Sequence, residues 1–263
     1  MAYSRSRRIG ASSMRRSTAR WGRRVRKQAR KEVLRLAESK RLWTYQVPLV
    51  QLSGFAANAF WQEQTIFNPL APLSFGSLPV SVEGTEFIDP LIALNIAVTM
   101  DWQRSMAIFS RPVTVRVVFY LVAVALELTG IASTARPLTT TEQQEFWLRP
   151  PFGGLKPVLN TNVVTVIRKK STTFSPRGIS YLGNATGGAL ETRNIKMSAR
   201  LRGTKQFQTS VTSTGEEAQA YLKGYNFYLL TVLMGNTTVP TAQLQGAMPV
   251  GCTADSFVYW KDF

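Results

Sequence analysis

The chain of 263 residues contains no histidine and only one cysteine, Cys252. Without histidine it cannot form a Ser/His/Asp or Cys/His catalytic group of the common kind, and one thiol cannot build a Cys/His zinc site. A single cysteine also excludes a disulfide within the chain, so the fold does not depend on an oxidising compartment. We therefore expect no catalytic residue, no metal and no cofactor, and we interpret Cys252 as a small buried apolar residue.

Charged residues and long apolar runs are also scarce. Charged side chains make up 18% of the chain, and the longest apolar run covers only residues 117–126. A helix needs about 20 apolar residues to span a bilayer, and no apolar segment or cleavage site follows the charged N-terminus. We expect no membrane segment and no secretory signal. A body with so little charge is what buried contacts between subunits would produce.

The positive charge that is present lies almost entirely at the N-terminus. Residues 1–41, here called the arm, carry 15 basic and 2 acidic side chains, a net +13. The other 222 residues carry 17 basic and 13 acidic side chains, a net +4. Such dense like charge repels itself until a polyanion neutralises it, and it cannot bury enough apolar area to order itself.

The composition of the arm indicates which polyanion it binds. Arginine outnumbers lysine there by 12 to 3, which favours bidentate phosphate contacts that release counterions and carry no sequence preference. No helix-turn-helix, zinc finger or paired-aromatic RNA-binding sheet is apparent, so base-specific readout is not predicted. The residues that we expect to bind nucleic acid in the arm are Arg5, Arg7, Arg8, Arg15, Arg16, Arg20, Arg23, Arg24, Arg26, Lys27, Arg30, Lys31 and Arg35.

The arm divides into two parts. Residues 1–18 are rich in Arg and Ser without apolar periodicity, and we expect this tip to be disordered. From 20 to 42 apolar residues recur at helical spacing, which predicts a helix, either ordered when its charge is neutralised or packed as a basic helix on the body. Trp21 can stack on a base, although we prefer to interpret it as the apolar anchor of this helix.

Nuclear targeting and attachment to a membrane surface would each account for less of the arm than nucleic-acid binding does. Nuclear targeting needs only a short basic cluster, so it can coexist with packaging of nucleic acid. Binding to a membrane surface would require a large aromatic and leucine face, which residues 1–18 lack.

Beyond the arm, residues 42–263 read as one all-β domain. Apolar alternation and β-branched runs bounded by Gly and Pro predict eight strands, and eight strands with hardly a helix favour an antiparallel double-sheet jelly roll. The expected strands are 43–52, 91–100, 113–125, 162–170, 193–201, 205–211, 224–234 and 254–260.

Three details of the body carry further expectations. The strand 113–125 is apolar on both faces, so we expect the core or a neighbouring subunit to cover both of them. The strands 193–201 and 205–211 read as a hairpin-like pair. The excursions 55–83 and 129–159 read as long loops, which we expect at contacts between subunits or on the outer surface.

A second basic cluster spans the end of the expected strand 193–201 and the start of the next, and it consists of Arg200, Arg202 and Lys205. If these strands face the same side as the arm, Arg200 and Arg202 extend the phosphate-binding surface. The alternative is a solvated strand edge without a function.

The order of segments along the body resembles a known family. An Arg-rich N-terminus is followed by GTEFIDPLIALNIAVTMDW, RPVTVRVVFYLV, LNTNVVTVIRKKSTTFSP, RNIKMSARLRGTKQFQ and GYNFYLLTVLMG. This order resembles the capsid proteins of small circular Rep-encoding single-stranded DNA viruses, the circovirus-like group. The resemblance covers most of the chain. One departure is the basic triplet Arg168-Lys169-Lys170, which stands where that family has an acidic and basic pair.

The resemblance implies a jelly-roll coat subunit of about 60 copies in a small icosahedral shell. Its partners would be copies of itself, a single-stranded DNA genome and an unknown host-cell receptor. We expect the protein in the virion and, during assembly, in the host nucleus. The alternatives are a coat protein of a small or satellite RNA virus of the same fold, and a non-viral nucleic-acid-binding module with a basic tail.

Overall fold

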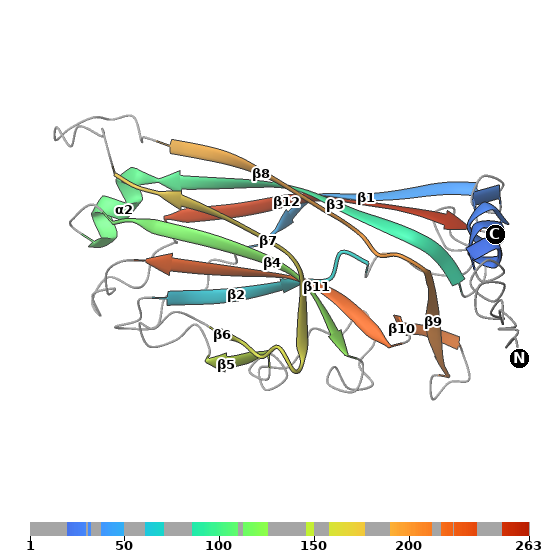
Figure 1. Ribbon diagram of the computed structural model, residues 1–263. Helices are drawn as coiled ribbons and strands as arrows, with labels where there is room; N and C mark the ends of the chain where they lie inside the picture. The colour runs from blue at the N-terminus through green and yellow to red at the C-terminus, as the bar shows by residue number, and fades with distance from the viewer. Residues whose placement is uncertain are drawn as a thin grey trace, which may run out of the picture.

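The computed structural model describes residues 20–29, 31–32, 38–49, 61–70, 86–109, 113–125, 146–149, 158–176, 190–211, 217–222, 224–235 and 249–262. Within them the chain is mostly β-strand, with helix at residues 20–29 and 31–32 and at α2 (Trp102–Phe109) (Figure 1). The strands are β1 (Glu38–Pro48), β2 (Trp61–Phe67), β3 (Glu86–Asp101), β4 (Val115–Ala125), β5 (Trp147–Arg149), β6 (Val158–Leu159), β7 (Val164–Phe174), β8 (Leu190–Arg200), β9 (Thr204–Val211), β10 (Glu217–Leu222), β11 (Tyr225–Gly235) and β12 (Val250–Asp262).

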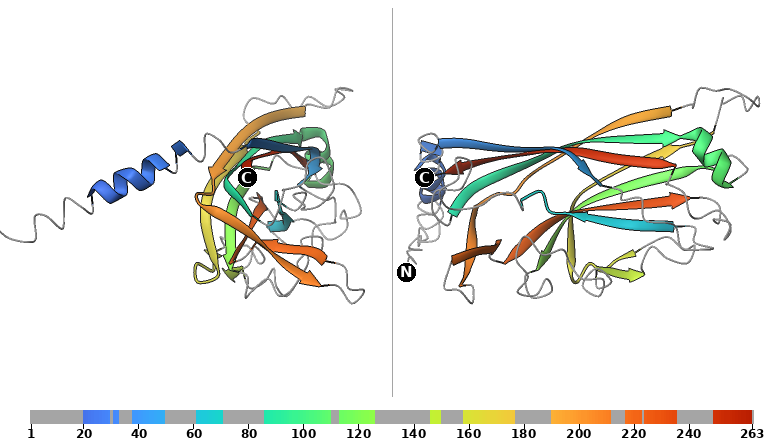
Figure 2. Two further views of the ribbon diagram at one scale, coloured as in Figure 1. Left: turned by 90° about the vertical axis from the view of Figure 1, so that its right-hand side faces the viewer. Right: turned by 180° about the vertical axis from the view of Figure 1, so that it is seen from behind.

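Two antiparallel sheets form the body. One has the order β1-β12-β3, with both β8 and β9 on β3 and β10 on β9; the other has the order β2-β11-β4-β7. The first strand pairs with the last, and each sheet joins strands that are distant in the chain, as two Greek keys require. Figure 2 shows the two layers. The expected antiparallel jelly roll is confirmed: eight of its strands follow the jelly-roll order when β8 and β9 are counted as one, and β10 extends the first sheet as a ninth.

The alternation of side chains in β3 explains which face of its sheet is inside. Ile92, Leu94, Ile96, Val98 and Met100 are all buried, while the residues between them are only partly buried or exposed. Because successive side chains of a strand point to opposite faces, this period of two directs one apolar row toward the second sheet. β12 alternates in the same way beside it.

β4 is buried on both of its faces. Its inner face, with Phe119 and Leu121, belongs to the main core between the sheets. Its outer face, with Tyr120 and Val122, forms a second apolar cluster with residues next to and within the short β5–β6 pair, including Phe146. The expectation that both faces of this strand are covered is confirmed, and part of the excursion 129–159 supplies the cover.

The strands β8 and β9 do not form the expected hairpin-like pair. β8 pairs with β3 from Leu91 onward, and β9 pairs with the beginning of the same strand. Between them the chain bends at Gly203, whose φ of 91° suits glycine, opposite Asp89, whose φ is 45°. The Gly203 N–H donates to the Asp89 carboxylate at 2.5 Å, and the Asp89 N–H donates to the Gly203 carbonyl at 3.1 Å. The two segments are therefore one bent strand.

Two further expectations need correction. Residues 61–67 form β2 at the edge of the second sheet, so the loop expected over 55–83 is interrupted by a strand. The helix expected over 20–42 is wrong at its end, because residues 38–42 belong to β1. Pairing of Glu38 with Asp262 continues the ladder to the end of β12, which overrides the helical spacing of the apolar residues. The tip expected to be disordered, 1–18, lies outside the described residues.

Cys252 lies in β12 and is buried, as expected. Burial raises the pKa of its thiol from 9.0 to about 12, so the native protein holds almost no thiolate at pH 8. We predict that a disulfide-forming aromatic reagent modifies Cys252 slowly in the native chain and completely in urea. Rapid modification of the native chain at pH 8 would contradict this burial. The thiol is therefore also a probe of whether variants fold.

Candidate nucleic-acid interface

The arm is described at residues 38–41, which belong to β1, and at residues 20–29 and 31–32, which form a helix that presents its cations to solvent. Arg20, Arg24, Lys27 and Lys31 follow one another at spacings of three and four residues, so they form one stripe along the helix. Like charges at this spacing destabilise a helix, and phosphates that neutralise them stabilise it. The exposed cations of this helix that we expected to bind nucleic acid are Arg20, Arg23, Arg24, Arg26, Lys27 and Lys31.

The helix stands apart from the two sheets, near the end of the sandwich where β1 begins and β12 ends (Figure 2). Trp21 is 69% exposed and Val25 is also exposed, so neither anchors the helix on the body of the same chain. The other expected arm residues lie outside the described residues, and these are Arg5, Arg7, Arg8, Arg15, Arg16, Arg30 and Arg35.

The second basic cluster lies where β8 passes into β9. Arg200 and Arg202 are exposed, whereas Lys205 is partly buried. The Lys205 ammonium donates to the Arg202 carbonyl at 3.3 Å and lies 5.9 Å from the ring centroid of Phe227. Lys205 therefore supports the bend in the strand, while Arg200 and Arg202 remain available to a ligand.

The register of the sheet connects Arg200 with the base of the arm. Arg41 of β1 is opposite Tyr259 of β12, Tyr259 is opposite Leu91 of β3, and Leu91 is opposite Arg200 of β8. The four residues thus form one row across four strands, and three of them are exposed. Residues directly opposite in a ladder point to the same face. The structure therefore places Arg200 on the sheet face that also carries Arg41, the last residue of the arm.

Two carboxylates near this face bind backbone groups. The Asp255 carboxylate accepts the N–H of Gln46 at 3.0 Å, where β1 bulges and Gln46 has a φ of 51°. Asp89 accepts the N–H of Gly203, as described above. Both carboxylates stabilise irregular backbone. The exposed cations Arg41, Lys196 and Arg200 outnumber the one exposed carboxylate of β3, Glu86, so the face has a positive character.

Two residues of the basic triplet of β7, Arg168 and Lys169, make contacts within the fold. The Arg168 guanidinium donates to the Ser198 carbonyl of β8 at 3.3 Å, and the Lys169 ammonium lies 5.0 Å from the ring centroid of Tyr120. Arg168 thus connects the edge strands of the two sheets, and Lys169 covers the outer apolar cluster. These contacts explain why basic residues suit positions 168 and 169.

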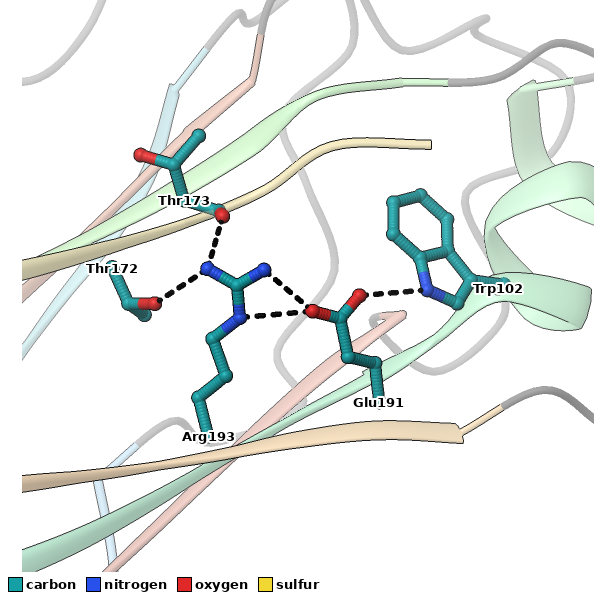
Figure 3. A network of polar contacts seen from close by, with 5 residues as sticks. All are labelled: Trp102, Thr172, Thr173, Glu191 and Arg193. Carbon is teal, nitrogen blue, oxygen red and sulfur yellow. Dashed lines mark hydrogen bonds and ion pairs between the residues drawn. The ribbon is translucent and has the colours of Figure 1, made fainter. Parts of the chain in front are cut away.

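A reciprocal contact closes the same edge of the sandwich (Figure 3). The Arg193 guanidinium of β8 donates to the Thr173 carbonyl of β7 at 2.7 Å, and it pairs with Glu191 at 2.6 Å. The other carboxylate oxygen of Glu191 accepts the indole N–H of Trp102 at 3.2 Å. Exposed ion pairs contribute little stability by themselves, but the bond from Arg193 to Thr173 joins the two sheets.

The described residues contain neither a metal-binding group nor a membrane-spanning helix. No three His, Cys, Asp or Glu side chains gather there into a metal-binding group. No helix in the same part of the chain has the length and apolar character needed to cross a membrane.

Sequence reasoning missed the aromatic residues on the outward face of β1 and β12. Trp43 and Tyr45 alternate in β1, and Tyr259 lies opposite Arg41 in β12. The alternation of Trp43 and Tyr45 is a visible signal of a shared face. Their pairing with a strand more than 200 residues away is not visible in the sequence.

Comparisons with known proteins add little to this geometry. No protein-family model matches the chain, and no curated protein matches it. Among solved structures, one match is "Trichodysplasia spinulosa-associated polyomavirus (TSPyV) VP1 in complex with 3'-sialyllactose". It has 7% sequence identity and a TM-score of 0.22, and the alignment covers 86% of this chain and 96% of that chain. A TM-score this low carries no argument, so the assignment of a jelly roll rests on the strand order and register.

Proposed function

We propose that the chain is a viral coat subunit that assembles into a small closed shell and packages single-stranded DNA through its arm. In this function the protein is structural and has no catalytic role. Its partners are other copies of the same chain and the packaged genome. It belongs to the virion and, during assembly, to the host nucleus.

The observation that carries the proposal is the contrast between the arm and the body. A net charge of +13 on residues 1–41 precedes a sandwich whose sequence contributes only +4. Jelly rolls occur in viral capsids but also in lectins and cupins, so the fold does not decide the function. The exposed helical cations add the phosphate-binding property that a coat protein needs on its inner surface.

Assembly would make a weak binder effective. With about 60 copies in the smallest closed icosahedral shell, arms of +13 would place about 780 positive charges on the inner side. Each phosphate contact releases condensed counterions, so the many arms together can condense a short genome. The same array explains why no arm needs sequence specificity.

The chemistry of arginine and phosphate does not distinguish DNA from RNA, so the choice of DNA rests on the resemblance to the circovirus-like coat proteins. We predict that nucleic acid extracted from particles of the full chain is destroyed by DNase and by a nuclease specific for single strands, and survives RNase. Destruction by RNase alone would instead identify the coat protein of an RNA virus. A full chain that forms no particles at all would indicate a non-viral binding module.

A further inference from the structure

Four aromatic side chains share the outward face of the paired strands β1 and β12. The ring centroids of Trp43 and Tyr45 are 6.4 Å apart, and those of Tyr45 and Phe257 are 6.3 Å apart with the rings edge to face. Tyr259 lies one row further along the same face. Trp43 is 44% exposed, Tyr45 is 59% exposed and Tyr259 is 41% exposed. We call these four residues, which stand on the upper sheet of Figure 1, the aromatic face.

The exposure of this face contrasts with the other sheet. There, the outward apolar residues of β4 are covered by Phe146, Trp147 and Val164 of the same chain. An exposed cluster of large apolar side chains usually marks a binding surface, because water contact with it is unfavourable. We therefore expect a ligand or partner from outside the described residues to cover the aromatic face.

Cations border the aromatic face on both sides. The Arg41 guanidinium lies 5.1 Å from the ring centroid of Trp43. Arg200 ends the cross-strand row that begins with Arg41 and passes through Tyr259. The two arginines are separated by three strand spacings, or about 14 Å between their backbones. This separation allows two phosphates of one extended single strand to contact Arg41 and Arg200 at the same time. The bases between these phosphates can then lie over the aromatic face.

We propose that the aromatic face is a base-stacking platform for single-stranded nucleic acid, a proposal that rests on the packaging function above. Trp43, Tyr45 and Tyr259 stack on bases, and Arg41 and Arg200 bind the flanking phosphates. Stacking requires an unpaired base, so this surface selects single strands over duplexes, which the arm alone cannot do. Every base has a flat face, so the platform needs no particular sequence.

Charge and position favour nucleic acid over a second copy of the chain as the occupant. In a two-fold contact of this face with itself, Arg41, Lys196 and Arg200 would oppose like charges. The nearby carboxylates of Asp255 and Asp89 are bound to backbone N–H groups and are poorly placed to compensate. In addition, β1 begins within the last residues of the arm, so a nucleic-acid strand bound by the arm lies close to the platform.

The experiment compares two fluorescent probes with the same number of phosphates, an oligothymidylate of about 20 nucleotides and an abasic strand of equal length. Binding of the full-length chain is measured by anisotropy over a range of salt concentrations. We predict that the chain binds oligothymidylate about tenfold more tightly than the abasic strand. Trp43→Ala and Tyr259→Ala should each remove most of this preference and leave the salt dependence unchanged, because they remove no phosphate contact.

Matched variants separate stacking from structure. Trp43→Phe should restore most of the preference, and Tyr225→Ala, which removes an aromatic side chain that is 54% exposed on β11, should not alter it. Protection of Cys252 from modification shows that each variant is folded. Equal binding of both probes by the unaltered chain would overturn the platform and leave packaging by the arm intact. Failure to bind either probe would overturn both. If the Trp43→Ala variant failed to assemble into particles but still preferred oligothymidylate to the abasic strand, the platform would be wrong. The aromatic face would then be an interface between copies of the chain.

Discussion

A chain that begins at residue 38 will fold its sandwich but will carry almost no nucleic acid into particles. The deletion removes 13 basic side chains and Glu32, a net +12, and lowers the net charge from +17 to +5. It ends before β1 because Glu38 pairs with Asp262 and Arg41 contacts Trp43. A deletion to residue 41 would also remove the first part of β1. A loss of folding could then not be separated from a loss of packaging.

The physical reason for the loss is counterion release. For single strands, the slope of the logarithm of affinity against the logarithm of salt concentration changes by about 0.7 for each phosphate contact. The truncated chain should therefore bind single-stranded DNA weakly and with a much flatter salt dependence. The ratio of absorbance at 260 and 280 nm of purified particles measures what is packaged, and Cys252 protection measures folding.

A matched control keeps the length of the arm but removes four of its 15 basic side chains. Replacement of Arg20, Arg23, Arg24 and Arg26 by glutamine should weaken packaging in part, whereas replacement of all four by lysine should retain most of it, because the charge remains. A truncated chain that packages the same amount of nucleic acid with unchanged salt dependence would contradict the role of the arm.

The largest expected effect on stability comes from the core between the sheets. Phe119 on β4 is fully buried and packs in the main cluster. Phe119→Ala removes buried apolar surface and leaves a cavity that a rigid pair of sheets fills poorly, so we predict a loss of about 3–5 kcal/mol in the free energy of unfolding. Urea unfolding at equal protein concentration measures it.

An exposed aromatic residue provides the comparison. Tyr225→Ala should change the free energy of unfolding by no more than about 0.5 kcal/mol, because solvent replaces few packing contacts there. If Phe119→Ala lowered the free energy of unfolding as little as Tyr225→Ala, the inner face of β4 would not lie between the two sheets. The described packing of one sheet on the other would then be wrong.

The strands that the sequence revealed are those with strong periodicity. β3 is predicted by the alternation that ends in Ile96, Val98 and Met100. β4 is predicted by the β-branched run that includes Val117 and Val118, and β11 is equally clear. These strands lie in the middle of their sheets, where apolar contacts on the inner face require such residues.

What escaped prediction depended on pairing between distant segments. β2 contains Gln62, Glu63 and Gln64 and lies at the edge of its sheet, where only pairing with β11 identifies it as a strand. Similarly, β1 extends back to Glu38 because β12 continues opposite it. The expected phosphate-binding residues follow from charge alone, but the aromatic face arises from the register of the first and last strands, which no local pattern reveals.

The central claim is that many copies of this chain enclose nucleic acid with their arms inside, and electron microscopy of the purified full-length protein tests it most directly. We predict closed particles of one diameter with about 60 copies and with internal nucleic-acid density that contacts the helix at residues 20–29 and 31–32. Particles of the chain that begins at residue 38 should lack this density. A protein that remains a monomer or small oligomer in the presence of single-stranded DNA, or shells that display the arm outside, would contradict the claim.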